Sequence, residues 1–388
     1  SSFFRPPPRD VLKTRGGGEN KKLYRGGIKM IDTVNLNLTV NPVTKPELLS
    51  QEQGIELLLS QLEKIQNCDI MAYKPQEYKI RVRLSYPRTF DRTNAYLILT
   101  AEECQEVHHR FVNDILNFKN YKEEEILVTW FLNYVRISIT QVDIPFTYYI
   151  GTDETFNDYQ NIYKIVSEVF KFKNNKAIPK SIGSYLEDDI ETLILADTRN
   201  VGGYNKKVTI YNQAAKMQDY YIEKPKIYNN ITSQYPDLDS RMRLEVSKRL
   251  KLNAKDLIEF SEFDIYSKYV IKFAKYALEN LFDQNVLNEI YSQKINNLVN
   301  LLQYSKQFPY FNYRIFILSN KNIIYDYKLL RQAIFNTMEN ENAKYSASST
   351  VKSILKGLET DTGIIYMNTI EKINNIRNLL ERIIRGER

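Results

Sequence analysis

Three segments of this chain combine a β-branched, strand-like pattern with one chemically reactive polar side chain each. They are Val135–Tyr149, Lys207–Asn212 and Arg241–Lys248. The reactive residues are Asp143, Tyr211 and Glu245, in that order. A buried strand does not ordinarily carry a carboxylate without a partner, because an isolated buried charge is costly. If the three strands are neighbours in one sheet, two carboxylates and a phenol converge on one face. Such a set can bind a divalent metal and direct a phenol oxygen at phosphorus.

The length and composition indicate an intracellular globular protein. The 388 residues are enough for two domains, and a hydrophobic content of 43% supplies a core. The two cysteines, Cys68 and Cys104, lack metal-ligand spacing, which favours a reducing compartment over a disulfide framework or a zinc site. The sequence has no run of about 18 apolar residues and no secretory pattern at its start. We therefore expect a cytoplasmic protein with no membrane partner.

The net charge of +7 is concentrated at the N-terminus. Residues 1–29 hold eight Lys or Arg and two acidic residues, a net charge of +6, together with short proline and glycine runs. We expect a disordered basic tail there, which can attract phosphate non-specifically and is equally typical of a solvated leader. The rest of the chain has a net charge of only +1, which does not by itself indicate binding to nucleic acid.

The segment Tyr78–Tyr86 (YKIRVRLSY) has the cleanest period-two alternation in the chain. Its apolar residues occupy one face, and Lys79, Arg81 and Arg83 occupy the other. A strand with a basic outer face suits a phosphate backbone, and an ordinary solvated strand has the same pattern. Both interpretations stay open on the sequence alone.

The patterns together predict an α+β fold, with a mainly antiparallel sheet, helices on one face, and a mostly helical C-terminal domain. Strands are expected near 31–40, 78–86, 135–149, 192–196, 207–212 and 241–247, and helices near 45–66, 101–118 and 157–171. We divide the chain into a tail (1–29), a unit that holds the reactive residues (30–250) and a helical domain (251–388). In the last, we expect helices over 254–303, 350–358 and 369–384, and a short strand at 310–318.

The two carboxylates each allow a structural and a chemical interpretation. Glu245 shares one strand face with Arg241 and Arg243, which fits a cross-face salt bridge. It also fits a hard oxygen ligand for Mg²⁺ or Mn²⁺, with the arginines on phosphate oxygens. Asp143 precedes Pro145, which ends central strand pairing, so Asp143 fits a turn cap as well as a metal ligand.

Tyr211 is the candidate nucleophile. A phenol has a pKa near ~10 and is a poor nucleophile at neutral pH unless a nearby metal withdraws its proton. Tyr204, in the expected hairpin turn before Tyr211, is the competing candidate. The neighbouring His108 and His109 diverge on a helix and do not chelate well together. Phosphate-loop, dinucleotide, zinc-protease and paired-cysteine motifs are absent, so nucleotide hydrolysis, dinucleotide redox chemistry and thiol catalysis lose their usual support.

On these residues, the segment 30–250 resembles the filamentous-phage gene II type of rolling-circle replication initiator, and more distantly plasmid initiators and conjugative relaxases. The resemblance rests on Met30-Ile31-Asp32-Thr33, on Tyr86-Pro87-Arg88 followed by Asn94-Ala95, and on the strands of Asp143, Tyr211 and Glu245. Three positions depart from the family pattern: Gln141 stands for an arginine, Gln213 for a lysine, and Lys216 for an acid.

The resemblance implies a site-specific nick in one strand of origin DNA. Tyr211 would become linked to the 5′ phosphate, release a 3′ hydroxyl, and allow later rejoining. It implies Asp143 and Glu245 as ligands of Mg²⁺ or Mn²⁺, and DNA contacts from Arg241, Arg243, Lys79, Arg81, Arg83, Arg88 and Asn94. The implied partners are duplex and single-stranded origin DNA and a host helicase, in the cytoplasm of a bacterial host.

Two alternatives stay open beside the initiator. A conjugative relaxase would use the same chemistry at a transfer origin. A noncatalytic origin-binding protein would hold Tyr211 and Glu245 in a packed hydrogen-bond network. The helical domain would read duplex DNA or contact the helicase, and the segment 348–358 fits either a recognition helix or a packing helix. The sequence leaves the oligomeric state open.

Overall fold

The computed structural model describes residues 31–45, 47–118, 124–151, 154, 156–174, 178–184, 189–197, 205–250 and 260–387. Its framework is one eight-stranded sheet in the order β2-β3-β1-β4-β8-β7-β6-β5, with antiparallel pairing throughout. The strands are β1 (Thr33–Val40), β2 (Cys68–Lys74), β3 (Lys79–Ser85), β4 (Val135–Tyr149), β5 (Ile178–Ser184), β6 (Asp189–Ala196), β7 (Lys206–Asn212) and β8 (Arg241–Arg249). The predicted fold class is confirmed. The predicted tail, residues 1–29, lies outside the described residues.

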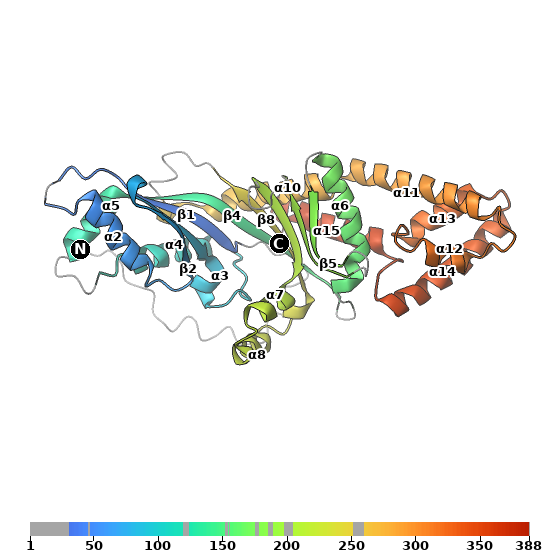
Figure 1. Cartoon of the computed structure of the whole chain (residues 1–388), viewed down its shortest axis with the longest axis horizontal. Coiled ribbons are helices and arrows are strands. Elements are labelled where there is room, and N and C mark those ends of the chain that lie inside the picture. Colours follow the sequence, from blue (N-terminus) through green and yellow to red (C-terminus); the bar gives the residue numbers. More distant parts are fainter. Residues whose placement is uncertain are drawn as a thin grey trace.

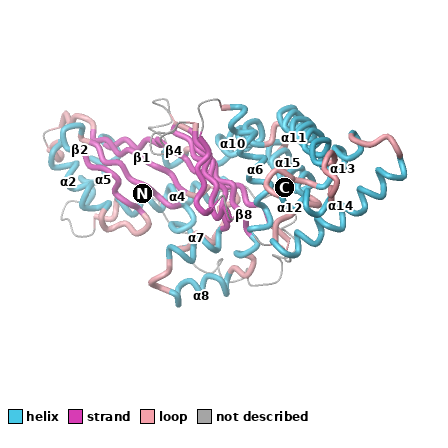
Figure 2. Tube along the Cα trace, turned by 45° about the vertical axis from the view of Figure 1, so that its right-hand side comes forward, coloured by secondary structure: helices cyan, strands magenta, loops and turns pink. Residues whose placement is uncertain are grey.

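The sheet has one apolar and one polar face, because successive residues of a strand point to opposite sides. In β1, Val34, Leu36, Leu38 and Val40 are buried, and the residues between them are half-buried. The pairing register extends this alternation, since directly paired residues share a face. Figure 2 shows the strands as one continuous sheet, with the C-terminal helices gathered beyond its β8 side.

Helices cover the apolar face and complete the main hydrophobic core (Figure 1). They are α2 (Gln51–Leu62), α4 (Ala101–Ile115), α5 (Glu124–Tyr134), α6 (Gln160–Lys173), α10 (Ile265–Leu281) and α15 (Thr369–Ile384). α15 spans the residues that the sequence predicted, and it buries Ile373, Ile376, Leu380 and Ile383 at helical spacing. These helices pack on the apolar face, and the candidate site lies on the opposite, polar face.

The remaining C-terminal helices enclose a second hydrophobic core. They are α11 (Gln284–Ser305), α12 (Tyr313–Ser319), α13 (Tyr327–Asn336) and α14 (Glu341–Thr362). α10 and α15 lie beyond residue 250 in sequence, yet they pack in the main core with the sheet. Part of the 251–388 segment therefore belongs to the main core. The domain boundary near residue 250 stays a prediction.

Two sequence expectations about local structure are wrong. Pro145 does not end strand pairing, because it pairs with Glu245 inside β4, which continues to Tyr149, and Asp143 therefore lies within a central strand and caps no turn. The strand expected at 310–318 is helix α12, which begins after the N-cap Asn312. The segment after β3 begins with the short helix α3 (Tyr86–Asp91), where Pro87 occupies the first turn. The segment 348–358 belongs to α14 and buries Ser348, Val351 and Leu355, so it packs in the second core.

A small third cluster lies at the end of the sheet, where β7 runs directly into α7 (Gln213–Tyr220). Helix α8 (Pro225–Gln234) follows it. The cluster joins Ala95, from the loop after α3, with Ala214, Met217, Ile231 and Leu238. The chain therefore places α7 and α8 beside the C-terminal end of β7. Within the described ranges, every helix is too short or too polar to cross a lipid bilayer.

Gly54 tests the packing of α2 against α5. A Cβ at Gly54 would lie 2.2 Å from Cζ2 of the fully buried Trp130. We predict that Gly54→Ala lowers the free energy of unfolding by about 1–3 kcal/mol, because overpacking exceeds the ~1 kcal/mol helix preference of alanine. Thermal unfolding followed by circular dichroism measures this.

Gly357 in α14 is the matched control, since a Cβ there meets nothing within 4 Å. Gly357→Ala should raise the stability by about 0.4–1 kcal/mol. A Gly54→Ala variant as stable as the parent would contradict the α2–α5 packing.

Candidate functional site on the polar face

The register brings the three reactive strands together. β4, β8 and β7 are consecutive in the sheet. Asp143 pairs with Ser247, Thr209 pairs with Glu245, and Tyr211 pairs with Arg243. Since paired residues share a side, these six residues form the polar face of the sheet. The condition set by the sequence, that the three strands be neighbours, is met.

Tyr211 and Glu245 form a buried hydrogen bond at the centre of the polar face. The Tyr211 hydroxyl donates to Glu245 Oε2 at 2.9 Å. Tyr211 is 2% exposed and Glu245 is 8% exposed. Burial, and then the negative charge of Glu245, raise the pKa of the Tyr211 phenol well above its ordinary value. In this arrangement the phenol keeps its proton and points it at a carboxylate.

Three cations surround Glu245. Burial raises the pKa of the Glu245 carboxyl, but Lys216, Lys207, Arg243 and the hydrogen bond from Tyr211 together lower the pKa below its usual range. Lys216, on α7, holds its Nζ 3.9 Å from the centre of the Tyr211 ring. This is a cation–π contact directly on the candidate nucleophile. Glu245 is therefore ionised, and positive charge lies on two sides of the phenol.

Asp143 lies diagonally across from Glu245 on the neighbouring strand, and the two carboxylates repel each other. Burial, and then the charge of Glu245, raise the pKa of Asp143 to about 6. Gln141 Nε2 donates to Asp143 Oδ1 at 3.1 Å, and Arg83 Nη2 lies 3.8 Å from Oδ2. Arg83 is half exposed at the rim of the face. These contacts offset only part of the cost of burying Asp143.

A third carboxylate, Asp32, is paired with Arg243. Arg243 Nη1 donates to Asp32 Oδ2 at 3.3 Å, and both side chains are buried. Asp32 precedes β1, and its backbone N–H donates to the carbonyl of Asp143. The ion pair therefore holds Arg243 in place beside Tyr211. The sequence contained this residue in the opening motif but gave it no role.

The donor set on the polar face suits a hard divalent cation. Asp143 and Glu245 are two carboxylates whose like charges repel each other in a buried site, and the Gln141 and Ser247 side chains add neutral oxygens nearby. Oxygen ligands of this kind are those that Mg²⁺ and Mn²⁺ prefer. Among the described residues, no group of three or more His, Cys, Asp or Glu side chains is arranged to bind a metal. The predicted metal role of Asp143 and Glu245 thus fits the residues present and stays a prediction.

Two of the predicted DNA-contacting residues take part in structural contacts. Arg241 is 1% exposed and donates to Asp237 through Nε and Nη2 at 3.0 and 2.9 Å, and to the Ala95 carbonyl through Nη1 at 2.7 Å. Asn94 accepts from Ser85 Oγ, and its carbonyl accepts from Gln213 Nε2 at 2.7 Å. Both residues therefore fasten the loop after α3 to the start of α7. This geometry favours a positioning role for them over direct phosphate contact.

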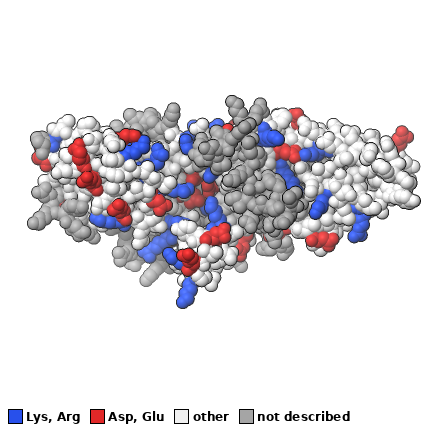
Figure 3. Space-filling view, in the orientation of Figure 1, with Lys and Arg blue, Asp and Glu red and all other residues white. Residues whose placement is uncertain are grey.

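The basic side of β3 lies on the polar face, at its edge. Arg81 is exposed and donates to Asn37 Oδ1, and Lys79 pairs with Glu77 at 3.0 Å. Arg83 reaches Asp143, so the strand leads from solvent toward the site. Blue and red side chains alternate over the side of the molecule in Figure 3 rather than forming one basic surface. The DNA-tracking role of the three β3 cations stays a prediction.

Other sequence candidates fall away from the site or outside the structure. Tyr204, the competing nucleophile, lies outside the described residues. His108 is buried against Phe260 and the Tyr86 hydroxyl, and burial lowers its pKa to about 3. His109 lies 3.3 Å from Glu262.

Lys216 is the main site residue that sequence reasoning did not assign. It was noted only as a departure from the family pattern, and so was Gln213, which replaces a lysine. The structure shows Gln213 tied to the Asn94 carbonyl and Lys216 over the Tyr211 ring. The sequence signal that could have identified Lys216 was its position five residues after Tyr211, across the junction of a strand and a helix.

Comparison with known proteins adds a distant likeness to a solved structure. No protein-family model and no curated protein matches the chain. Among solved structures, it is similar to a rolling circle replication initiator protein from Geobacillus stearothermophilus, with a TM-score of 0.29 and 13% sequence identity. The match covers 67% of this chain and 91% of that chain. This likeness is too slight for an inference about activity, which rests on the residues themselves.

The pKa of Asp143 predicts how stability depends on pH. A carboxyl whose folded pKa is raised binds more protons in the native state between its unfolded pKa and about pH 6, so stability falls as pH rises through that window. Asp143→Asn removes the buried charge. We predict that the variant is more stable than the parent at pH 7.5, by an amount of order 1–3 kcal/mol.

The comparison at pH 4 is the internal control, since Asp143 is protonated there and the difference should largely vanish. Urea unfolding at both pH values measures it. An equal stability difference at pH 4 and pH 7.5 would show that the charge of Asp143 is not the cause.

Proposed function

We propose that this chain nicks and rejoins one strand of origin DNA through a phosphotyrosine intermediate, and so starts rolling-circle replication of a phage or plasmid. One observation carries the proposal: the Tyr211 hydroxyl donates to Glu245 on a buried polar face that also holds Asp143 and Arg243. A phenol so placed has a proton acceptor, flanking cations for a phosphate, and a second carboxylate within the same site. The resemblance found in the sequence points to the same chemistry.

The proposed reaction is a transesterification at phosphorus. The Tyr211 oxygen forms a bond to the phosphorus, and the bond to the 3′ oxygen breaks. The phenol proton passes to Glu245 and from there to solvent, and the leaving 3′ oxygen takes one proton from solvent, so charge and atoms balance. The raised pKa of Tyr211 and the lowered pKa of Glu245 oppose this transfer in the structure as it stands. A bound Mg²⁺ or Mn²⁺ on Asp143 and Glu245 would favour the phenolate and polarise the phosphate.

Arg243 and Lys216 supply the positive charge that the phosphate requires. Arg243 is fixed by Asp32 and pairs with Tyr211 across the strands. A planar guanidinium held in this way can take two phosphate oxygens at once. Lys216 lies over the ring of Tyr211, and Tyr211 is 2% exposed. The Lys216 amine must therefore move before a phosphate can reach the phenol. We therefore expect Lys216 to move from the ring to the phosphate when DNA binds.

A noncatalytic origin-binding protein is the second candidate. The low exposure of Tyr211 and its hydrogen bond to Glu245 are also what a packed polar network shows. A conjugative relaxase shares the chemistry, and only the DNA and partners distinguish it. A host helicase contact through the C-terminal helices remains part of the proposal, as does DNA contact by Lys79, Arg81 and Arg88.

Tyr211→Phe tests the nucleophile. The protein is incubated with labelled single-stranded DNA from the parent element's presumed origin, with Mn²⁺ or EDTA, and run on a denaturing gel. We predict a metal-dependent protein–DNA adduct that is lost in Tyr211→Phe, with the fold and DNA binding retained. Tyr163→Phe is the matched control, because Tyr163 is an equally buried tyrosine whose hydroxyl contacts Met242 on the apolar side of the sheet.

The other outcomes discriminate between the candidates. An adduct that survives in Tyr211→Phe moves the role to another residue, with Tyr204 first. Tight, metal-independent DNA binding without any adduct favours the noncatalytic protein.

A thermal shift tests the metal site without relying on activity. Mn²⁺ at a concentration 100 times its Kd should stabilise the folded protein by about 2.7 kcal/mol, as ligands that bind only the native state do. We predict that Asp143→Asn and Glu245→Gln each remove most of this shift relative to EDTA. Glu106→Gln, a surface carboxylate paired with Arg110, should keep it. A full Mn²⁺ shift in both site variants would exclude this pair as the metal ligands.

A further inference from the structure

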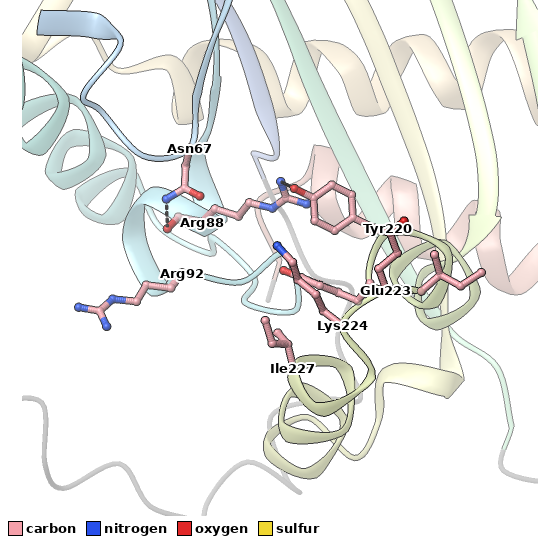
Figure 4. A pocket seen from close by; sticks show the side chains of 9 residues that line it. Asn67, Arg88, Arg92, Tyr220, Glu223, Lys224 and Ile227 are labelled. Atoms are coloured by element: carbon pink, nitrogen blue, oxygen red, sulfur yellow. Dashed lines mark hydrogen bonds between the residues drawn. The ribbon is translucent and has the colours of Figure 1, made fainter.

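A concave site lies beside the polar face, between α3 and the junction of α7 with α8. Its cavity volume is about 310 Å³. Arg88 and Arg92 line one side, from the end of α3, and the segment Tyr220–Lys224 lines the other. Figure 4 shows the Arg88 and Tyr220 side chains against each other across the opening, with Arg92 pointing away from them. The size suits one flat ring system rather than an extended polymer.

The lining combines exposed apolar surface with positive charge. Tyr220 is 61% exposed and Ile222 is 77% exposed. The lining holds three cations, Arg88, Arg92 and Lys224, and one carboxylate, Glu223. Proteins that bind single-stranded nucleic acid pair aromatic platforms for bases with cations for phosphates in this way. A purely apolar ligand would leave the cations unused, and a bare anion would leave the aromatic platform unused.

Arg88 holds the Tyr220 ring in position at the cavity. Its guanidinium lies 4.1 Å from the centre of the Tyr220 ring, and Nη1 donates to the Tyr220 hydroxyl at 2.9 Å. The Nε of Arg88 is buried, and among the described residues it has no hydrogen-bond partner. The pair also orients the Tyr220 ring, so that one face meets Arg88 and the ring stays largely exposed.

The backbone around this cavity is strained in two places. Asn67 has φ 66° and Arg92 has φ 62°, and both line the cavity. Asn67 holds the Arg88 carbonyl through its side-chain amide at 3.2 Å. Left-handed φ values in residues other than glycine persist where the surroundings hold them, often at binding sites. The wall that presents Arg88 is therefore fixed in position.

The path from this cavity to Tyr211 is short. α7 begins two residues after Tyr211 and ends at Tyr220, and its eight residues span about 12 Å at 1.5 Å per residue. A single strand with stacked bases covers that length in roughly three to four nucleotides at ~3.4 Å each. Bases within a duplex are stacked and paired, so only an unpaired base can enter the cavity.

We propose that this cavity binds an unpaired nucleotide of the strand that Tyr211 attacks, three to four nucleotides from the scissile phosphate. The base stacks on the exposed part of Tyr220, and Arg88 and Lys224 contact the neighbouring phosphates. This inference rests on the proposed DNA function, because the ligand is the same strand. It adds a requirement for unpaired DNA beside the nick and a residue, Tyr220, that reads the base.

The test compares two 12-nucleotide probes by fluorescence anisotropy, oligothymidine and an abasic strand with the same phosphates. Both are measured in a Tyr211→Phe background, so that no covalent chemistry interferes. The parent should bind oligothymidine more tightly than the abasic strand. Tyr220→Ala should weaken oligothymidine binding about 5- to 150-fold and leave the abasic strand almost unaffected. Tyr220→Phe should keep most of the preference.

Arg88→Ala and Lys224→Ala should weaken binding of both probes and reduce the dependence on salt, because they contact phosphates. Tyr310→Ala is the control, since Tyr310 is 90% exposed and lies in the C-terminal helical part. It should leave both affinities unchanged. Circular dichroism of each variant confirms that it is folded.

An unchanged preference for oligothymidine in Tyr220→Ala would overturn the proposal, as would an equal loss for both probes. This outcome is distinct from failure of the proposed function. If no adduct forms with Tyr211 intact while the Tyr220-dependent base preference is present, the nicking activity is wrong and the nucleotide site stands. If an adduct forms but binding shows no base preference, the nucleotide site is wrong and the nicking activity stands.

Discussion

The register of three antiparallel strands is the constraint on which the candidate site depends. Direct pairing puts Asp143 beside Ser247, Thr209 beside Glu245, and Tyr211 beside Arg243. A slip of one residue in any of these strands would move its polar residue to the face covered by helices, where a charge has no partner. The apolar residues between them, such as Ile144, Leu244 and Ile210, hold the register because they are buried in the main core. Burial of the apolar face therefore fixes the geometry of the polar face.

The charges on the polar face are arranged in pairs that leave one carboxylate incompletely compensated. Asp32 neutralises Arg243, and Lys216 and Lys207 stabilise the ionised Glu245. Gln141, Ser247 and the half-exposed Arg83 offset only part of the cost of burying Asp143, and its pKa rises to about 6. This imbalance is expected where a further cation or a substrate completes a site, because functional groups are often held at a cost in stability. Lys216 extends the site from the sheet onto α7, and α7 connects it to the cavity at Tyr220.

Sequence periodicity predicted the sheet well where alternation was regular, and poorly elsewhere. The strands of Asp143, Tyr211 and Glu245, the basic β3 and helix α15 all follow from the spacing of their apolar residues. β2 was missed because its register shifts at a bulge, which interrupts the alternation. Helix α12 was mistaken for a strand because its β-branched and aromatic residues have strand propensity, while packing in the second core and the Asn312 cap favour a helix. The Asp32–Arg243 pair and the Lys216 contact join residues that only the folded chain brings together, so no local pattern reveals them.

Mapping the residue that carries DNA tests the central claim most directly. The adduct formed with origin DNA is digested with nuclease and trypsin, and the modified peptide is sequenced by mass spectrometry. Trypsin releases residues 208–216, VTIYNQAAK, in which Tyr211 is the only tyrosine. The account predicts a nucleotide 5′-phosphate on Tyr211 in this peptide. A nucleotide on any other residue, or an unmodified 208–216 peptide from a purified adduct, would contradict it.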